Sequence, residues 1–179
     1  MGNTNENKKV KTLLLDLKSG EEEKQLKAIK ALKVSGNVSV LEPMIAELIK
    51  TDSVKVEHEI IEFLSSLKDS DAPEAMIKCL ENEDFQDVRG LLLNTIWNSG
   101  LDYKPHLKAI VNVALDGEMM EALECITILE NTNGPFTEEE IMEPLLSVQE
   151  YLSNTTEETH KNEIIKEIAV FLAQINENL

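Results

Sequence analysis

The chain has 179 residues, of which 42% are hydrophobic, and its formal net charge is −17. The apolar content can supply a core, which excludes a fully disordered chain, and the length favours one domain. The acidic excess argues against general nucleic-acid binding, because phosphates are bound by Lys and Arg. The polar beginning of the sequence and the lack of a long apolar run predict a cytoplasmic protein without membrane contact. We expect a single domain over residues 1–179, with residues 1–8 disordered.

Apolar residues recur at helical spacing almost from end to end. The first segment runs from Val10 to Leu17 and stops at Ser19-Gly20. The second, through Leu26, Ile29 and Leu32, begins with three glutamates that complement the positive end of a helix dipole. Few glycines and many Leu, Glu, Lys, Ile and Ala residues favour an all-α protein.

Four prolines open the segments that follow, at Pro43, Pro73, Pro105 and Pro144, with intervals of 30, 32 and 39 residues. Proline suits the first turn of a helix, because the N–H that it lacks would have no partner there. A helix start that recurs at this period is typical of a stacked helical repeat. The pattern predicts ten helices: about four pairs in a right-handed α-α superhelix, with a single capping helix at each end.

The fourth pair departs from this pattern. Thr137 followed three residues later by Glu140 is a capping box, which predicts a helix that starts well before Pro144. We therefore expect Pro144 inside this helix, with a kink, whereas the other three prolines begin theirs.

One stretch resembles a known family. In Asp87-Val88-Arg89, followed by Pro105 and Leu107, the order of residues resembles a HEAT repeat. The resemblance implies a HEAT-like solenoid, with an armadillo-type solenoid as the near alternative. It also implies a non-catalytic scaffold or adaptor that binds a protein or peptide along the concave face of its second helices. On that face we expect the following partner-binding residues: Glu42, Glu47, Glu74, Lys78, Lys104, Lys108, Asn112, Glu139, Glu140, Glu143 and Glu150.

Charge is unevenly distributed along the chain. Residues 109–160 contain twelve acids and no Lys or Arg, whereas residues 1–36 contain eight Lys and five acids. The acidic stretch indicates either plain solubility or electrostatic attraction of a basic segment in the partner. The polarity also leaves open weak head-to-tail self-association, through the lysines of the basic beginning, or a DNA mimic.

No residue pattern points to catalysis, a cofactor or a metal. His58 and Glu59 resemble the start of a zinc-protease helix, but Glu62 stands where the second His is needed. Cys79 and Cys125 are expected to be buried reduced thiols, Trp97 a core residue, and Arg89 a partner of Asp87 or of a carboxylate in a neighbouring repeat. The alternative is a HEAT-like enzyme or ligand-binding chaperone of the lyase type, which predicts a deep apolar cleft with a few convergent polar groups.

Overall fold

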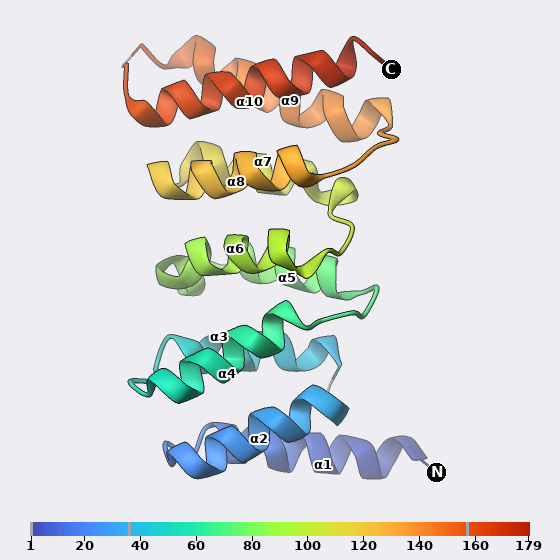
Figure 1. Cartoon of the computed structure of the whole chain (residues 1–179), viewed down its shortest axis with the longest axis vertical. Helices are drawn as coiled ribbons and strands as arrows, with labels where there is room; N and C mark the ends of the chain where they lie inside the picture. Colours follow the sequence, from blue (N-terminus) through green and yellow to red (C-terminus); the bar gives the residue numbers. More distant parts are fainter. Residues whose placement is uncertain (1, 36, 157) are drawn as a thin grey trace. The chain divides into compact units, whose positions relative to one another are not determined.

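In a computed structural model the described backbone covers residues 2–35, 37–156 and 158–179, and the described side chains begin at residue 8 and omit Ser35. This described part is helical, with turns and loops and without strands. Its ten α-helices confirm the predicted all-α class (Figure 1). They are α1 (Gly2–Leu17), α2 (Glu22–Ser35), α3 (Leu41–Leu48), α4 (Val54–Ser65), α5 (Ala72–Leu80), α6 (Arg89–Ser99), α7 (Leu107–Asp116), α8 (Met119–Asn131), α9 (Glu138–Asn154) and α10 (His160–Asn176). Three 3-10 turns separate some of them: η1 (Val38–Val40), η2 (Glu83–Val88) and η3 (Lys104–His106).

The chain divides into two compact units, Met1–Val88 and Arg89–Leu179. In the first unit α3 packs against α1 and α5, while α2 packs against α4. In the second unit α7 packs against α9, while α8 packs against α6 and α10. Within each unit, then, odd-numbered helices adjoin odd-numbered ones and even-numbered helices adjoin even-numbered ones. This repeat-like arrangement of helices is the one that a HEAT-like solenoid predicts.

The end helices are not single caps. Helix α1 packs along α2, and α10 packs along α9 as well as α8. The pairs therefore begin one helix earlier than the prolines indicate: α1 with α2, α3 with α4, α7 with α8 and α9 with α10. The periodicity of one helix shows which side is apolar, but it does not show which neighbour covers that side.

The first helix also begins earlier than its apolar residues indicate. It starts at Gly2, whereas the sequence predicted disorder over residues 1–8; Met1 lies outside the described residues. The opening turns are polar, so they have no apolar periodicity from which a helix could be recognised.

The prolines occupy three kinds of helical position. Pro43 and Pro73 lie in the first turns of α3 and α5, as predicted. Pro105 lies in η3, directly before α7, and Pro144 lies inside α9. The capping box of α9 is present: the Thr137 amide donates to the Glu140 carboxylate over 2.7 Å, and the Glu140 amide donates to the Thr137 hydroxyl over 3.3 Å.

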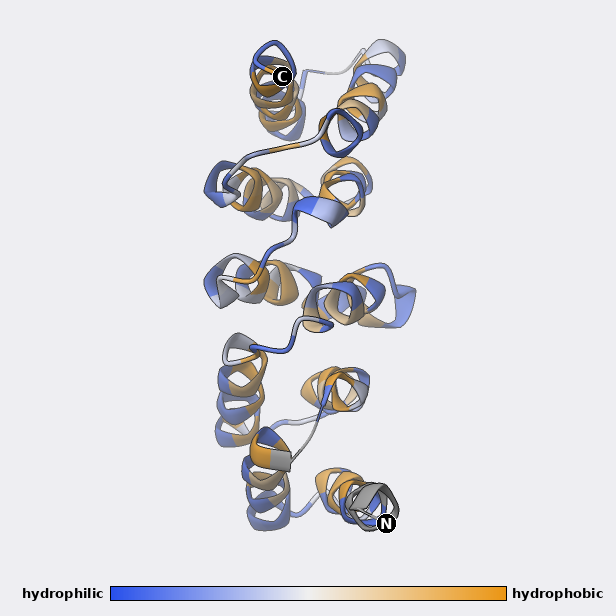
Figure 2. Cartoon of the chain, turned by 90° about the vertical axis from the view of Figure 1, so that its right-hand side faces the viewer, coloured by the Kyte–Doolittle hydropathy of each residue, from blue (hydrophilic) through white to orange (hydrophobic). Residues whose placement is uncertain are grey.

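Apolar side chains fill the space between the odd-numbered and even-numbered helices of each unit. Figure 2 shows apolar residues of α4 and α8 on the side toward the odd-numbered helices of the same unit, with hydrophilic residues on the outside. Residues such as Ile60, Leu64, Cys125 and Leu129 are fully buried there. Burial of one such side chain contributes about 1.5–3 kcal/mol, so these positions provide most of the cohesion between the helices.

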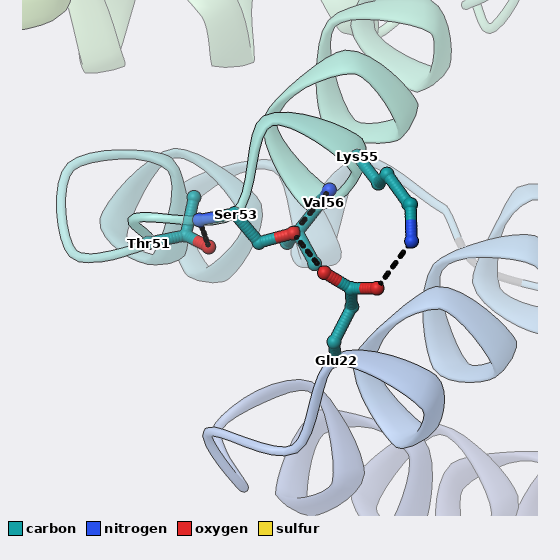
Figure 3. A network of polar contacts seen from close by, with 5 residues as sticks. All are labelled: Glu22, Thr51, Ser53, Lys55 and Val56. Carbon is teal, nitrogen blue, oxygen red and sulfur yellow. Dashed lines mark hydrogen bonds and ion pairs between the residues drawn. The ribbon is translucent and has the colours of Figure 1, made fainter.

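Polar contacts join successive even-numbered helices at their ends. The carboxylate of Glu22, in the first turn of α2, accepts hydrogen bonds from the Ser53 hydroxyl over 2.7 Å and from the Lys55 ammonium over 2.8 Å (Figure 3). Ser53 is the N-cap of α4, and its hydroxyl also accepts from the Val56 amide. One carboxylate therefore fixes the start of α4 against the start of α2, and these contacts lower the pKa of Glu22.

Candidate partner-binding surface

A groove of about 300 Å³ runs between the beginnings of α7 and α9. Pro105, Leu107, Thr137 and Pro144 supply part of its wall. The rest comes from five residues that the sequence predicted for partner binding: Lys104, Lys108, Glu139, Glu140 and Glu143. Residues about 35 positions apart therefore meet because α7 and α9 lie side by side.

The charged groups of this α7–α9 groove are only partly neutralised. The Lys108 ammonium lies 3.0 Å from the Glu143 carboxylate, and both side chains are about half exposed, at 52% and 51%. Lys104 lies 3.5 Å from Asp102, outside the groove lining. Glu140 is engaged in the capping box of α9 and Glu143 in the exposed ion pair with Lys108. Glu139 can turn toward a partner, and Glu143 can do so by exchanging its exposed contact with Lys108.

One exposed face of α9 continues from the groove. Glu139, Glu143, Leu146 and Glu150 follow one another at intervals of four, three and four residues, which places them along one side of a helix. Leu146 is 55% exposed, and the three glutamates are exposed. The three glutamates were predicted from the sequence, whereas Leu146 was not, although its helical spacing from Glu143 and Glu150 is visible in the sequence. Asn112 of α7 is half-buried and, like Glu150, does not line the groove.

The first unit has a smaller counterpart. Glu42 and Lys78 line a hollow of about 200 Å³ between α3 and α5, together with Cys79, Asn82 and Phe85. Lys78 is engaged by Glu74 of its own helix over 2.6 Å, and all three charged residues are exposed.

Glu47 is not a surface residue, which corrects the sequence prediction. It is 8% exposed, and its carboxylate accepts a 2.6 Å hydrogen bond from the side-chain amide of Gln25. Burial raises its pKa, although Lys50, Gln25 and Lys18 act in the opposite direction. The inward-facing side of α3 also carries Met44, Ile45 and Leu48, so a residue between them is carried into the core. Glu47 cannot contact a partner without leaving that core.

Arg89 pairs with a carboxylate, as the sequence predicts, and this carboxylate lies on the next even-numbered helix, α8. Its guanidinium forms two hydrogen bonds with the Glu121 carboxylate of α8; the Nη2 bond measures 3.0 Å. Burial alone would raise the pKa of Glu121, but Arg89 and the Glu118 amide together lower it. Glu121 also accepts from that amide over 2.6 Å and so completes the capping box of α8. This ion pair is structural, because both side chains are largely buried.

Trp97 corrects a second prediction. It is 39% exposed rather than part of the core, and its indole N–H donates to Glu124 over 3.2 Å. The inward positions of α6 are taken by Leu92, Leu93 and Ile96, and the residue after Ile96 turns to the side of the helix.

The cysteines are free and buried, as predicted. Burial raises the pKa of Cys79 to about 11, and burial with the nearby Glu121 raises that of Cys125 still further. Because the thiolate is the reactive form, neither cysteine is a nucleophile at neutral pH. Over the described residues, no group of three His, Cys, Asp or Glu side chains is placed to hold a metal ion.

Residues 10–96 match the family model for HEAT repeats. The matched stretch begins in α1 and ends in α6. No curated protein sequence matches the chain. None of the helices in the described part is both long and apolar enough to cross a bilayer.

Proposed function

Residues 10–96 of this chain are HEAT repeats, which commonly serve as protein-interaction scaffolds, and we propose that the chain is a non-catalytic adaptor. Its partner site is the α7–α9 groove with the adjoining face of α9, and the partner is a protein segment that carries Lys or Arg beside an apolar residue. The observation that carries this proposal is the convergence of Glu139 and Glu143 with a half-exposed Leu146 on one continuous surface.

The acids of α9 fall into two groups according to their position along the helix. Glu138, Glu139 and Glu140 lie in the first turn, where negative charge stabilises any helix through its dipole. Glu143 and Glu150 lie beyond that turn, where the dipole provides no such benefit. Their placement on the exposed side of α9, on either side of Leu146, supports a role in binding rather than in holding the helix together.

The charge of the second unit favours a basic partner. Residues 89–179 contain 16 acids and five Lys or Arg. Of these five, Arg89 pairs with the buried Glu121, and Lys108 pairs with Glu143 at the groove itself. The remaining acidic excess produces a negative potential that speeds the approach of a basic segment and disfavours an acidic one.

The test uses a fluorescent peptide that places Lys and Leu along one face of a helix. A matched peptide has Glu in place of each Lys. We expect the wild-type chain to bind the Lys peptide and not the Glu peptide. The double variant Glu139→Lys, Glu143→Lys should weaken binding of the Lys peptide at least about tenfold, because two attractive charges become repulsive. Glu140 is left unchanged because it caps α9.

The control is Glu57→Lys, Glu81→Lys, which changes the net charge equally. Glu57 lies in the first turn of α4, as Glu139 does in α9, and both control residues are exposed in the first unit. We expect this control to bind the Lys peptide with nearly wild-type affinity. Equal loss in both variants would mean that only net charge attracts the peptide, and unchanged binding in the α9 variant would exclude this surface.

A further inference from the structure

Helix α1 presents a basic face with an exposed leucine at its centre. On its inner side Leu17 is fully buried, and Val10, Leu13 and Leu14 are half-buried. The opposite side carries Lys8, Lys11, Thr12 and Leu15, followed by Lys18 just after the helix, and all five are exposed. Leu15 is 72% exposed, so its side chain is open to a partner.

The lysines of this α1 face differ from many other lysines of the first unit in their contacts. Other lysines of the first unit form ion pairs: Lys24 with Glu21, Lys30 with Glu59, Lys33 with Glu62, Lys55 with Glu22 and Lys78 with Glu74. Within the described part of the chain, Lys8, Lys11 and Lys18 form no ion pair. Lys9, Lys27 and Lys50 of the first unit also form no ion pair within the described part of the chain, so what distinguishes the α1 face is that three such lysines follow one another along one side.

The α1 face and the α9 face have the same order of residues with opposite charge. Along α1 the order is Lys8, Lys11, Leu15, Lys18; along α9 it is Glu139, Glu143, Leu146, Glu150. At a rise of 1.5 Å per residue, both sets extend over about 15–17 Å. Two helices laid side by side in this register would bring each lysine close to a glutamate and the two leucines into contact.

We propose that α1 of one copy docks on the α9 face of a second copy, so that the chain associates head to tail. The inference rests on the proposed function, because it names the basic segment that this same surface receives. Each copy carries both faces, and the faces differ, so the contact is heterologous and can propagate from copy to copy. The exposed leucines bury apolar area at the centre, and the charges around them set register and orientation.

The experiment is sedimentation velocity of the full chain over a concentration series that reaches about 0.5 mM, where weak contacts are populated. We expect the wild type to sediment faster as concentration rises at low ionic strength. At about 1 M salt, where the Debye length is about 3 Å, it should sediment as a monomer. The variant Lys8→Glu, Lys11→Glu and the variant Glu139→Lys, Glu143→Lys should each remain monomeric at low ionic strength.

The two variants provide a charge-swap test when they are mixed. The α1 face of the first variant is then acidic and the α9 face of the second is basic, while the other two faces are unchanged. An equimolar mixture should regain concentration-dependent association, although neither variant associates alone. The control Lys9→Glu, Lys27→Glu alters exposed lysines outside the face by the same charge, and we expect it to associate as the wild type does.

A wild type that stays monomeric up to the highest concentration at low ionic strength overturns the proposal, as does a mixture that fails to regain association. Association that persists in either variant alone overturns it too, because the contact must then lie elsewhere. If the wild-type chain binds the Lys peptide yet stays monomeric, the proposed function stands and the partner is another protein. If the chain associates but the α9 substitutions do not affect peptide binding, the proposed function is wrong even though the chain self-associates.

Discussion

Among the side chains that the structure describes, each of the two units buries one glutamate, and the two carboxylates are held in opposite ways. In the first unit Glu47 is 8% exposed and receives a hydrogen bond from a neutral amide, that of Gln25. In the second unit Glu121 is 9% exposed and receives two hydrogen bonds from the charged guanidinium of Arg89. Burial raises the pKa in the first case, whereas in the second the cation and the Glu118 amide outweigh burial and lower it.

The difference shows that burial by itself does not decide the charge of a side chain in this fold. The cations and N–H donors around a carboxylate must together outweigh its burial before its pKa falls, as they do for Glu121 but not for Glu47. The same contrast holds on the surface. Lysines of the first unit neutralise many of its acids, whereas residues 109–160 contain twelve acids without any Lys or Arg. Four predictions test this comparison between the units.

The largest effect is expected from Arg89→Met. It leaves Glu121 buried without its cation, and breaking such a buried pair costs about 3 kcal/mol of unfolding free energy or more. Urea unfolding of the full chain measures the loss, and Arg89→Lys, which keeps a positive charge, should lose less. A loss below about 1 kcal/mol would show that Glu121 does not depend on Arg89.

Gln25→Leu should cost less, about 1–2 kcal/mol, because it removes one neutral donor from two acceptors. Those acceptors are the Glu47 carboxylate and the Leu17 carbonyl, at 2.6 and 3.0 Å. Loss of the Gln25 donor raises the pKa of Glu47 further, and uptake of a proton offsets part of the cost. The same urea measurement tests this prediction; a loss equal to that of Arg89→Met would erase the distinction between the two glutamates.

The pH dependence should differ in sign. The raised pKa of Glu47 means that the folded state binds its proton more readily, so stability rises as pH falls from the raised value toward the ordinary 4.5. The lowered pKa of Glu121 means that its contribution is complete above 4.5 and is lost as pH falls through the lowered value. Urea unfolding of the wild type, Glu47→Gln and Glu121→Gln at several pH values measures how each carboxyl group contributes to the pH dependence of the unfolding free energy. If both variants shift the pH profile in the same direction, the assignment is wrong.

The smallest effect is expected from Lys30→Met. Lys30 lies 3.3 Å from Glu59 with 65% of its side chain exposed, and solvent screens such a pair. We expect a change in unfolding free energy of about 0.5 kcal/mol or less, which high salt should remove. A larger, salt-independent loss would indicate that the lysine stem packs on apolar surface.

Much of the local structure could be predicted from the sequence. Helical spacing indicates the ten helices, Thr137 with Glu140 predicts the start of α9, and that start places Pro144 inside the helix. These features depend on residues a few positions apart, whose geometry is nearly the same in any helix. The family resemblance at Asp87-Val88-Arg89 likewise lies within a stretch that the HEAT family model matches.

Contacts between helices could not be predicted in this way. The sequence alone placed Glu47 on the surface and Trp97 in the core, and it left Arg89 with two candidate partners. It also predicted Lys108 and Glu143 as surface residues without showing that they form an ion pair.

The sequence by itself determined which segments are helical and where charge accumulates, because those properties depend on neighbours along the chain. Only the tertiary structure decided which helix covers which face. It buried Glu47 and Glu121 with different partners, and it brought α7 beside α9 to form the groove. The reason is physical: the apolar side of a helix is attracted to any apolar surface, so its partner is selected by the packing of the whole unit.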